Sequence, residues 1–239
     1  MATIITFFEY LFIGFISCGA LDITSVFIYN KLNNNSKYSQ NVRWFFIHCI
    51  MNMYITVKGL PNLIYSFHNI EKCTTSEWIN GYEIYGIAVA LHYYHIAFFK
   101  LNKMDWLHHI TSAIITTPVI LYTNTTCLSA VGLWFMSGLP GVIDYLLLWL
   151  VKMGYCQKKI EKVAYVAISC WIRAPGCIYT ATLQFGIMPH IDQYTWIELI
   201  GRFWTTLIVY WNGIYFMHLT LRDYYSNQAI RDELDKKNE

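Results

Sequence analysis

The chain has 239 residues, of which 56% are hydrophobic, 18% aromatic and 13% charged. Soluble domains carry about 25% charged residues, so this composition excludes an ordinary soluble domain and predicts a membrane protein. The formal net charge of +2 is too small to indicate nucleic acid binding, and we expect membrane lipids as partners.

Seven long apolar stretches follow one another along the chain. Each supplies the roughly 20 residues that a helix needs to cross about 30 Å of hydrocarbon. They cover approximately residues 4–29, 43–68, 79–99, 106–122, 127–151, 160–187 and 194–221. We therefore expect an all-α, multi-pass protein with a single seven-helix membrane domain over residues 1–225. A charged, mobile tail over residues 226–239 follows it. We expect no cleavable signal peptide, because the first stretch is long and carries Asp22.

The basic residues predict how the chain is oriented in the membrane. Lysines follow the first, third and fifth stretches, whereas Lys72 is the only basic residue in the connections after the second, fourth and sixth. Basic connections stay in the cytoplasm, so the N-terminus is expected in the lumen and the C-terminus in the cytoplasm. The terminal Lys236-Lys237-Asn238-Glu239 resembles a dilysine retrieval signal, which predicts the endoplasmic reticulum membrane.

Two luminal features are left open by the sequence. Cys73 and Cys127 both fall at luminal ends of stretches, where either a disulfide or two free thiols is compatible with the spacing. Asn124 begins a glycosylation sequon, but its loop is short and close to the bilayer, which disfavours modification.

Three prolines inside the stretches lie beside glycine: Pro61, Pro140 and Pro175. Proline removes a backbone donor, so we expect these helices to kink or loosen there. Ionisable residues also fall inside the stretches, and an ionised side chain at a helix centre costs roughly 2.5–3.5 kcal/mol. They are Asp22, Lys58, Glu83, Asp144, Arg173, Glu198 and Arg202. We expect Glu198 to pair with Arg202, and we expect Lys58, Asp144 and Arg173 in the interior, around a substrate or in a structural polar network.

The histidines point to a site. His92 and His95 lie on one face of the third stretch, near its cytoplasmic end, and His108 and His109 open the fourth at the same depth. Asp144, about eight residues from the cytoplasmic end of the fifth, is expected at the level of His92. Imidazoles beside a carboxylate are typical of a general base or nucleophile with an orienting acid, or of a metal site.

Several of these residues resemble a known family. His108-His109-Ile110-Thr111, at the start of a transmembrane helix, resembles the histidine-pair core of the TRAM–Lag1–CLN8 (TLC) domain family, which includes ceramide synthases. Residues 138–148 are similar to its polar, acidic helix, Trp171-Ile172-Arg173 to its aromatic–x–Arg position, and residues 210–215 to its final helix. The resemblance covers about residues 40–225. It implies that helices 2–7 form a barrel around a lipid cavity.

The resemblance to ceramide synthases implies acyl transfer from acyl-coenzyme A to a long-chain base. His108 or His109 would then accept the acyl group or act as base, with His92 and His95 beside them. Asp144 would orient or charge the imidazole, although ceramide synthases have paired aspartates there. The resemblance also implies that basic cytoplasmic residues, Lys100 and Lys103 among them, bind the coenzyme phosphates. Arg173 and Lys58 are candidate substrate contacts. Acyl-CoA is the expected co-substrate, no metal is expected, and a homodimer stays open.

Other readings remain. Phe98-Phe99-Lys100 followed by Asp105-Trp106-Leu107-His108-His109 resembles the region around the His-x-x-His-His box of fatty acid elongases, with Asp105 in place of the first His. A di-metal hydroxylase would need several histidine boxes, and the chain has one His-His pair. A non-catalytic lipid-handling protein, a channel or a seven-helix receptor shares the expected topology.

Overall fold

The computed structural model describes residues 2–32, 40–75, 81–123, 127–187 and 194–238. The sequon at Asn124 lies outside these residues. The described part is helical and contains no strand. Four of the predicted stretches correspond to one helix each: α1 (Ala2–Leu32), α2 (Gln40–His68), α4 (Gly81–Phe98) and α11 (Trp196–Asn238). A short helix, α3 (Ile70–Thr75), was not predicted.

The other three predicted stretches are continuous helical runs, each interrupted by one π-helical segment, labelled η. The first run is α5 (Lys103–His109), η1 (Ile110–Ile115) and α6 (Thr116–Tyr122). The second is α7 (Cys127–Leu133), η2 (Trp134–Gly138) and α8 (Leu139–Lys152). The third is α9 (Lys158–Ile168), η3 (Ser169–Arg173) and α10 (Ala174–Ile187). By length and composition, two segments of the described chain are long and apolar enough to cross a membrane: Ile4–Leu32 and Cys127–Lys152.

Each π-helical segment ends shortly before a proline. Pro140 follows η2 and Pro175 follows η3, where the sequence predicted loosening, and Pro118 follows η1. A π turn has one extra residue, so it re-routes the backbone hydrogen bonds that a proline disturbs. At Pro61, where the sequence predicted a kink or loosening, α2 stays α-helical. π-helical turns are common at functional sites, and η1 begins directly after His109.

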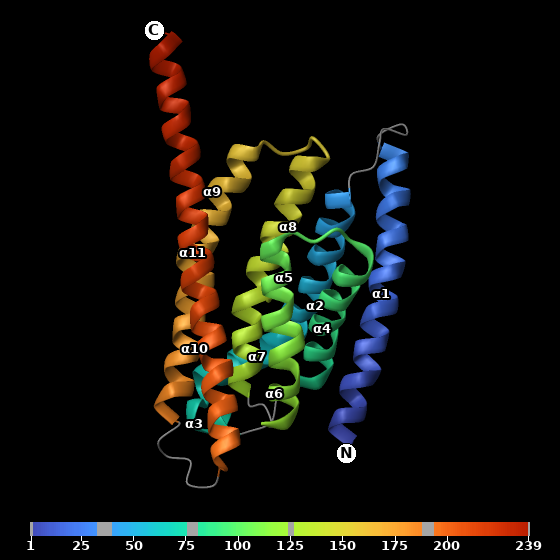
Figure 1. The fold of residues 1–239 in the computed structure, drawn as a ribbon, viewed down its shortest axis with the longest axis vertical. Coiled ribbons are helices and arrows are strands. Elements are labelled where there is room, and N and C mark those ends of the chain that lie inside the picture. Colours follow the sequence, from blue (N-terminus) through green and yellow to red (C-terminus); the bar gives the residue numbers. More distant parts are fainter. Residues whose placement is uncertain (1, 33–39, 76–80, 124–126, 188–193, 239) are drawn as a thin grey trace.

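Helix-to-helix contacts close a ring of six helical runs. In order around it, α2 contacts α4, α4 contacts η1, α6 contacts α11, α11 contacts α10 and α9, α9 contacts α8, and α8 returns to α2. Helix α1 lies at one edge of the bundle and packs mainly against α4 (Figure 1). Gly14 and Gly86 allow this close approach, since a Cβ on Gly86 would lie 2.8 Å from the Phe7 carbonyl oxygen.

A disulfide between Cys73 and Cys127 joins α3 to the start of α7. The sequence had left this bridge open. Disulfides form in oxidising compartments and not in the cytosol. The disulfide is therefore compatible with the expectation that the end of the bundle with α3 and the start of α7 lies in the lumen.

Residues 226–238, which were expected to form a charged, mobile tail, continue α11 to Asn238. The segment contains no glycine or proline and is rich in residues that favour helices, so nothing in it stops the preceding helix. Its last turns project beyond the other helices (Figure 1).

Three of the seven ionisable residues inside the predicted stretches form ion pairs between helices. Asp22 of α1 accepts hydrogen bonds from Arg43 of α2 and from the Tyr94 hydroxyl of α4, the latter at 2.9 Å. Glu83 of α4 lies 2.9 Å from the Lys58 ammonium of α2. Asp22 is 4% exposed, whereas 40% of the Lys58 side chain is exposed, so Lys58 is less interior than the sequence predicted.

Near the start of α11, Glu198 and Arg202 interact electrostatically, but each binds a different group. Glu198 accepts hydrogen bonds from the backbone and hydroxyl of Thr195 at 2.8 and 2.9 Å, which caps the helix. Arg202 donates to the Thr123 carbonyl at 2.8 Å and lies over the Tyr194 ring. Arg202 thereby joins α11 to the end of α6.

The packing of α10 predicts a sharp difference between two of its glycines. A Cβ on Gly176 would lie 2.0 Å from a ring carbon of Phe135, whereas a Cβ on Gly186 would meet nothing within 4 Å. We predict that Gly176→Ala destabilises the fold by about 1–3 kcal/mol through overpacking. The matched control Gly186→Ala should be neutral or slightly stabilising. Thermal unfolding in detergent measures both; equal midpoints would contradict the packing described for η2 and α10.

The ion pair of Asp22 predicts a second stability effect. Arg43→Gln leaves a buried carboxylate without its cation, and we expect a loss of about 3–5 kcal/mol. The double variant Asp22→Asn/Arg43→Gln removes both charges and should recover much of that loss. Thermal unfolding of the three proteins checks the coupling, and a double variant as unstable as Arg43→Gln alone would show that charge burial is not the cause.

Candidate functional site

Five histidines from three helices gather in one cluster. His48 comes from α2, His92 and His95 from α4, and His108 and His109 from the last turn of α5. His92 and His95 share a face of α4 because they are three residues apart. We call these five residues the histidine cluster.

The position of the histidine pair on α5 depends on how that helix begins. The Asn102 side-chain oxygen accepts hydrogen bonds from the backbone of Met104 and Asp105, at 2.8 and 2.9 Å. The Asp105 carboxylate in turn accepts from the Asn102 backbone at 2.9 Å, which completes a capping box. This cap sets where α5 starts, and therefore which way His108 and His109 point one turn later.

Three imidazoles form a hydrogen-bonded chain. His92 Nδ1 lies 2.9 Å from His109 Nδ1, and His109 Nε2 lies 2.8 Å from His95 Nδ1. A neutral imidazole has one donor and one acceptor nitrogen, so neutral rings in matching tautomers satisfy both bonds. His95 and His109 are buried, at 7% and 2% exposure. A proton can pass along such a chain when each ring accepts on one nitrogen and releases from the other.

His108 lies beside this chain and is more accessible. Its ring centre is 4.9 Å from that of His92, and its Nδ1 is 3.4 Å from the Ser112 hydroxyl. His92 and His108 are both partly exposed. His92, His108 and His109 each offer a ring nitrogen within 4.8 Å of the others, so these three can also hold a metal ion.

Aromatic rings hold one side of the cluster. Trp44 of α2 stacks on His95 with ring centres 3.5 Å apart, and it meets His48 edge-on at 4.0 Å. Tyr145 of α8 stacks on His48, with ring centres 4.0 Å apart. These contacts extend the cluster from α4 through α2 to α8.

On the other side, the cluster continues into η3 and α11. Phe216 meets His108 edge-on at 6.2 Å, and the Arg173 guanidinium lies 4.4 Å from the centre of the Phe216 ring. Arg173 also donates to the Asn212 side-chain oxygen at 2.9 Å and to the Tyr165 hydroxyl at 3.3 Å. Side chains from all six runs of the ring are therefore linked in one connected network that crosses its interior.

The structure brings together four of the predicted site residues: His92, His95, His108 and His109. Asp144 differs from the expectation. The described interactions of its carboxylate are electrostatic, with Arg173, Glu161 and Lys162, and none of them is with a histidine. The neighbouring Tyr145, and not Asp144, stacks on His48.

The other predicted site residues lie outside the cluster. Lys100 and Lys103 are exposed at the connection between α4 and α5, within a few residues of the histidine pair. Lys58 is ten residues from His48 on α2, which is about 15 Å along the helix axis, and it pairs with Glu83. Nothing in the described contacts links Lys58 to the histidines.

Sequence reasoning missed the contribution of α2. Trp44, His48 and Asn52 are spaced by four residues and so share a face, and Asn52 lies 3.5 Å from His48 Nδ1. That spacing, in a helix expected to lie in a membrane, was the available signal. Tyr145, next to the predicted Asp144, had no comparable signal because a tyrosine in an apolar helix is ordinary.

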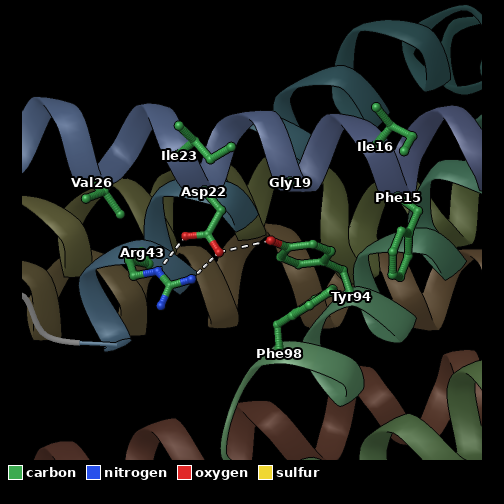
Figure 2. Close-up of a pocket in the computed structure, with 9 residues that line it drawn as sticks. All are labelled: Phe15, Ile16, Gly19, Asp22, Ile23, Val26, Arg43, Tyr94 and Phe98. Carbon is green, nitrogen blue, oxygen red and sulfur yellow. Dashed lines mark hydrogen bonds and ion pairs between the residues drawn. The ribbon is translucent and has the colours of Figure 1, made fainter.

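A second candidate site is a cavity of about 300 Å³ between α1, α2 and α4. Figure 2 shows the Asp22 carboxylate between Arg43 and Tyr94, with apolar side chains around them. Phe99, which contacts both Arg43 and His95, lies between this cavity and the histidine cluster. The charged groups in the cavity already bind each other, so it offers less chemistry than the cluster.

Comparison with known proteins adds no relative to this description. No protein-family model matches the chain, and no curated protein and no solved structure is similar to it. The function must therefore be argued from the site itself.

Proposed function

We propose that this chain is a multi-pass membrane enzyme of lipid metabolism, which transfers an acyl group from acyl-CoA to the amine of a long-chain base. One observation carries the proposal: a chain of hydrogen-bonded imidazoles, joined by aromatic and charged side chains to every run of a six-run helical ring. Acyl transfer to an amine needs a general base, and a neutral imidazole can supply one.

In this proposal all seven helical runs cross the membrane, with the N-terminus in the lumen and the C-terminus in the cytoplasm. Large apolar side chains are exposed on the outside of the bundle, among them Ile23 at 74%, Trp171 at 81% and Trp196 at 82%, which suits a surrounding lipid phase. The disulfide of Cys73 lies at the end expected in the lumen.

The ring of six runs would enclose the acyl chain and the long-chain base, with the histidine cluster toward the cytoplasmic end. Lys100 and Lys103, exposed at that end, are suited to bind the coenzyme phosphates. Lipid substrates would enter from the membrane and the soluble thioester from the cytosol, and the two would meet at His108.

The chemistry follows from the position of His108. The ammonium of the base first gives up one proton, and the His108 imidazole takes a second proton from the resulting amine as the amine nitrogen attacks the thioester carbonyl. The carbon–nitrogen bond forms, the carbon–sulfur bond breaks, and the coenzyme leaves as a thiol after it receives that proton. The chain of His92, His109 and His95 lies beside His108 and can accept the surplus proton.

Arg173 and Asp144 act as positioning residues in this scheme. Arg173 lies over Phe216, which contacts His108, and Asp144 balances the guanidinium charge. The guanidinium can also hydrogen-bond a substrate carbonyl, because it has five N–H groups and uses three of them on Asn212 and Tyr165.

Substitution of the histidines tests the proposed mechanism. His108→Ala and His109→Ala should each lower acyl transfer by about 100-fold or more, because they remove the base or its proton path. Asp144→Asn should lower kcat with little change in KM. The assay is mass spectrometry of N-acylated long-chain base formed by purified membranes from acyl-CoA.

The matched control is His218→Ala, since His218 is exposed on α11, away from the cluster. Full activity in both cluster variants would refute the mechanism. In cells with and without the protein, a change in acyl chain length in place of N-acylated products would favour an elongase-like enzyme. No change in lipids would favour a non-catalytic lipid-handling protein.

The accessibility of cysteines tests the proposed orientation of the chain in the membrane. Cys156, partly exposed between α8 and α9, is expected to face the cytosol, whereas the disulfide of Cys73 and Cys127 faces the lumen. In sealed microsomes, a membrane-impermeant maleimide should label Cys156, and Cys156→Ser should lose the label. Labelling of Cys156 only after the membrane is opened would reverse the proposed topology.

A further inference from the structure

We propose that His92, His108 and His109 form a binding site for one transition-metal ion of the Zn²⁺ class. This departs from the expectation drawn from the sequence, which included no metal. It does not rest on the proposed acyl transfer, because it concerns only the ligand geometry of the cluster.

The three ring nitrogens are close enough to share an ion. They lie within 4.8 Å of one another, and the shortest pair, His92 Nδ1 and His109 Nδ1, is 2.9 Å apart. Zinc–nitrogen bonds of about 2.0–2.1 Å place two ligands of a tetrahedral ion about 3.3 Å apart. To admit the metal, the shortest pair has to open by a few tenths of an ångström and the wider pairs, up to 4.8 Å apart, have to close toward the same separation.

Neighbouring groups hold the ligands in suitable tautomers. His109 Nε2 lies 2.8 Å from His95 Nδ1, so it can carry the proton and donate to His95, which leaves His109 Nδ1 as a ligand. His95 is in turn fixed by its stack on Trp44. His108 Nδ1 lies 3.4 Å from the Ser112 hydroxyl, which leaves His108 Nε2 as the ligand.

The donor set selects the class of ion. Three neutral imidazoles suit Zn²⁺, Cu²⁺, Ni²⁺ or Co²⁺, whereas Mg²⁺ and Ca²⁺ prefer oxygen ligands. Charges near the site act in both directions. Asp105 interacts electrostatically with His109 and favours a cation, and Arg173 interacts with His108 and disfavours one. Two of the three ligands are partly exposed, so a fourth, water ligand has room on their side.

The metal and the acyl-transfer reaction would use the same imidazole lone pairs. A loaded cluster cannot take a proton at His108, so the bound ion would act as an inhibitor of the proposed reaction. The two proposals are tested separately. Absence of acyl transfer would not contradict the metal site, and absence of metal binding would not contradict acyl transfer, because one is measured by the lipid product and the other by metal titration.

The test is metal binding by the purified full chain in lipid nanodiscs. After treatment with a chelator, the protein is titrated with Co²⁺ and then with Zn²⁺. We expect one ion per chain, the visible absorption of tetrahedral Co²⁺, and its loss when Zn²⁺ replaces it. X-ray absorption of the Zn²⁺-loaded wild-type protein should show imidazole nitrogen ligands. Substoichiometric binding, or coordination by oxygen alone, would overturn the proposal without any variant.

Variants then locate the ion. His92→Asn and His108→Asn, which keep a polar side chain, should abolish stoichiometric binding. His95→Ala should weaken binding by about 10–100-fold, because it removes the hydrogen bond that orients His109. The control His218→Ala should bind as the wild type does. Thermal unfolding confirms that each variant folds. Wild-type affinity in both Asn variants, or loss of binding in His218→Ala, would place the ion elsewhere and refute the site.

Discussion

Polar side chains inside an apolar helical bundle need partners on other helices, because neither lipid nor apolar packing can satisfy them. This constraint organises the protein. Asp22 binds Arg43 and Tyr94, Lys58 pairs with Glu83, and Arg173 donates a hydrogen bond to Asn212. Each pair ties two helical runs together, so the same contacts that neutralise polar groups also fix which helices are neighbours.

The histidine cluster follows from that arrangement. A capping box sets the start of α5, η1 follows directly after His109, and the i, i+3 spacing on α4 offers two imidazoles to the same point. Trp44 and Tyr145 close the sides with stacked rings. Neutral imidazoles held this close can exchange protons or share a metal ion, and these are the two chemistries that we propose for the cluster.

Much of the helical layout was predictable, since each predicted stretch corresponds to a helix or a continuous run. Local detail was harder. The π-helical turns before Pro118, Pro140 and Pro175 depend on how neighbouring helices fit, and the continuation of α11 to Asn238 was not among the expectations. Whether Cys73 meets Cys127 depends on α3, which is too short to give a pattern.

The sequence by itself determined an all-helical chain, its apolar segments and the shared face of His92 and His95, since these follow from composition and from the period of a helix. Only the tertiary structure decided which side chains meet across helices. It placed His48 and Tyr145 at the cluster. The rotation of each helix about its axis is set by packing against its neighbours, and one residue of difference turns a side chain by about 100°.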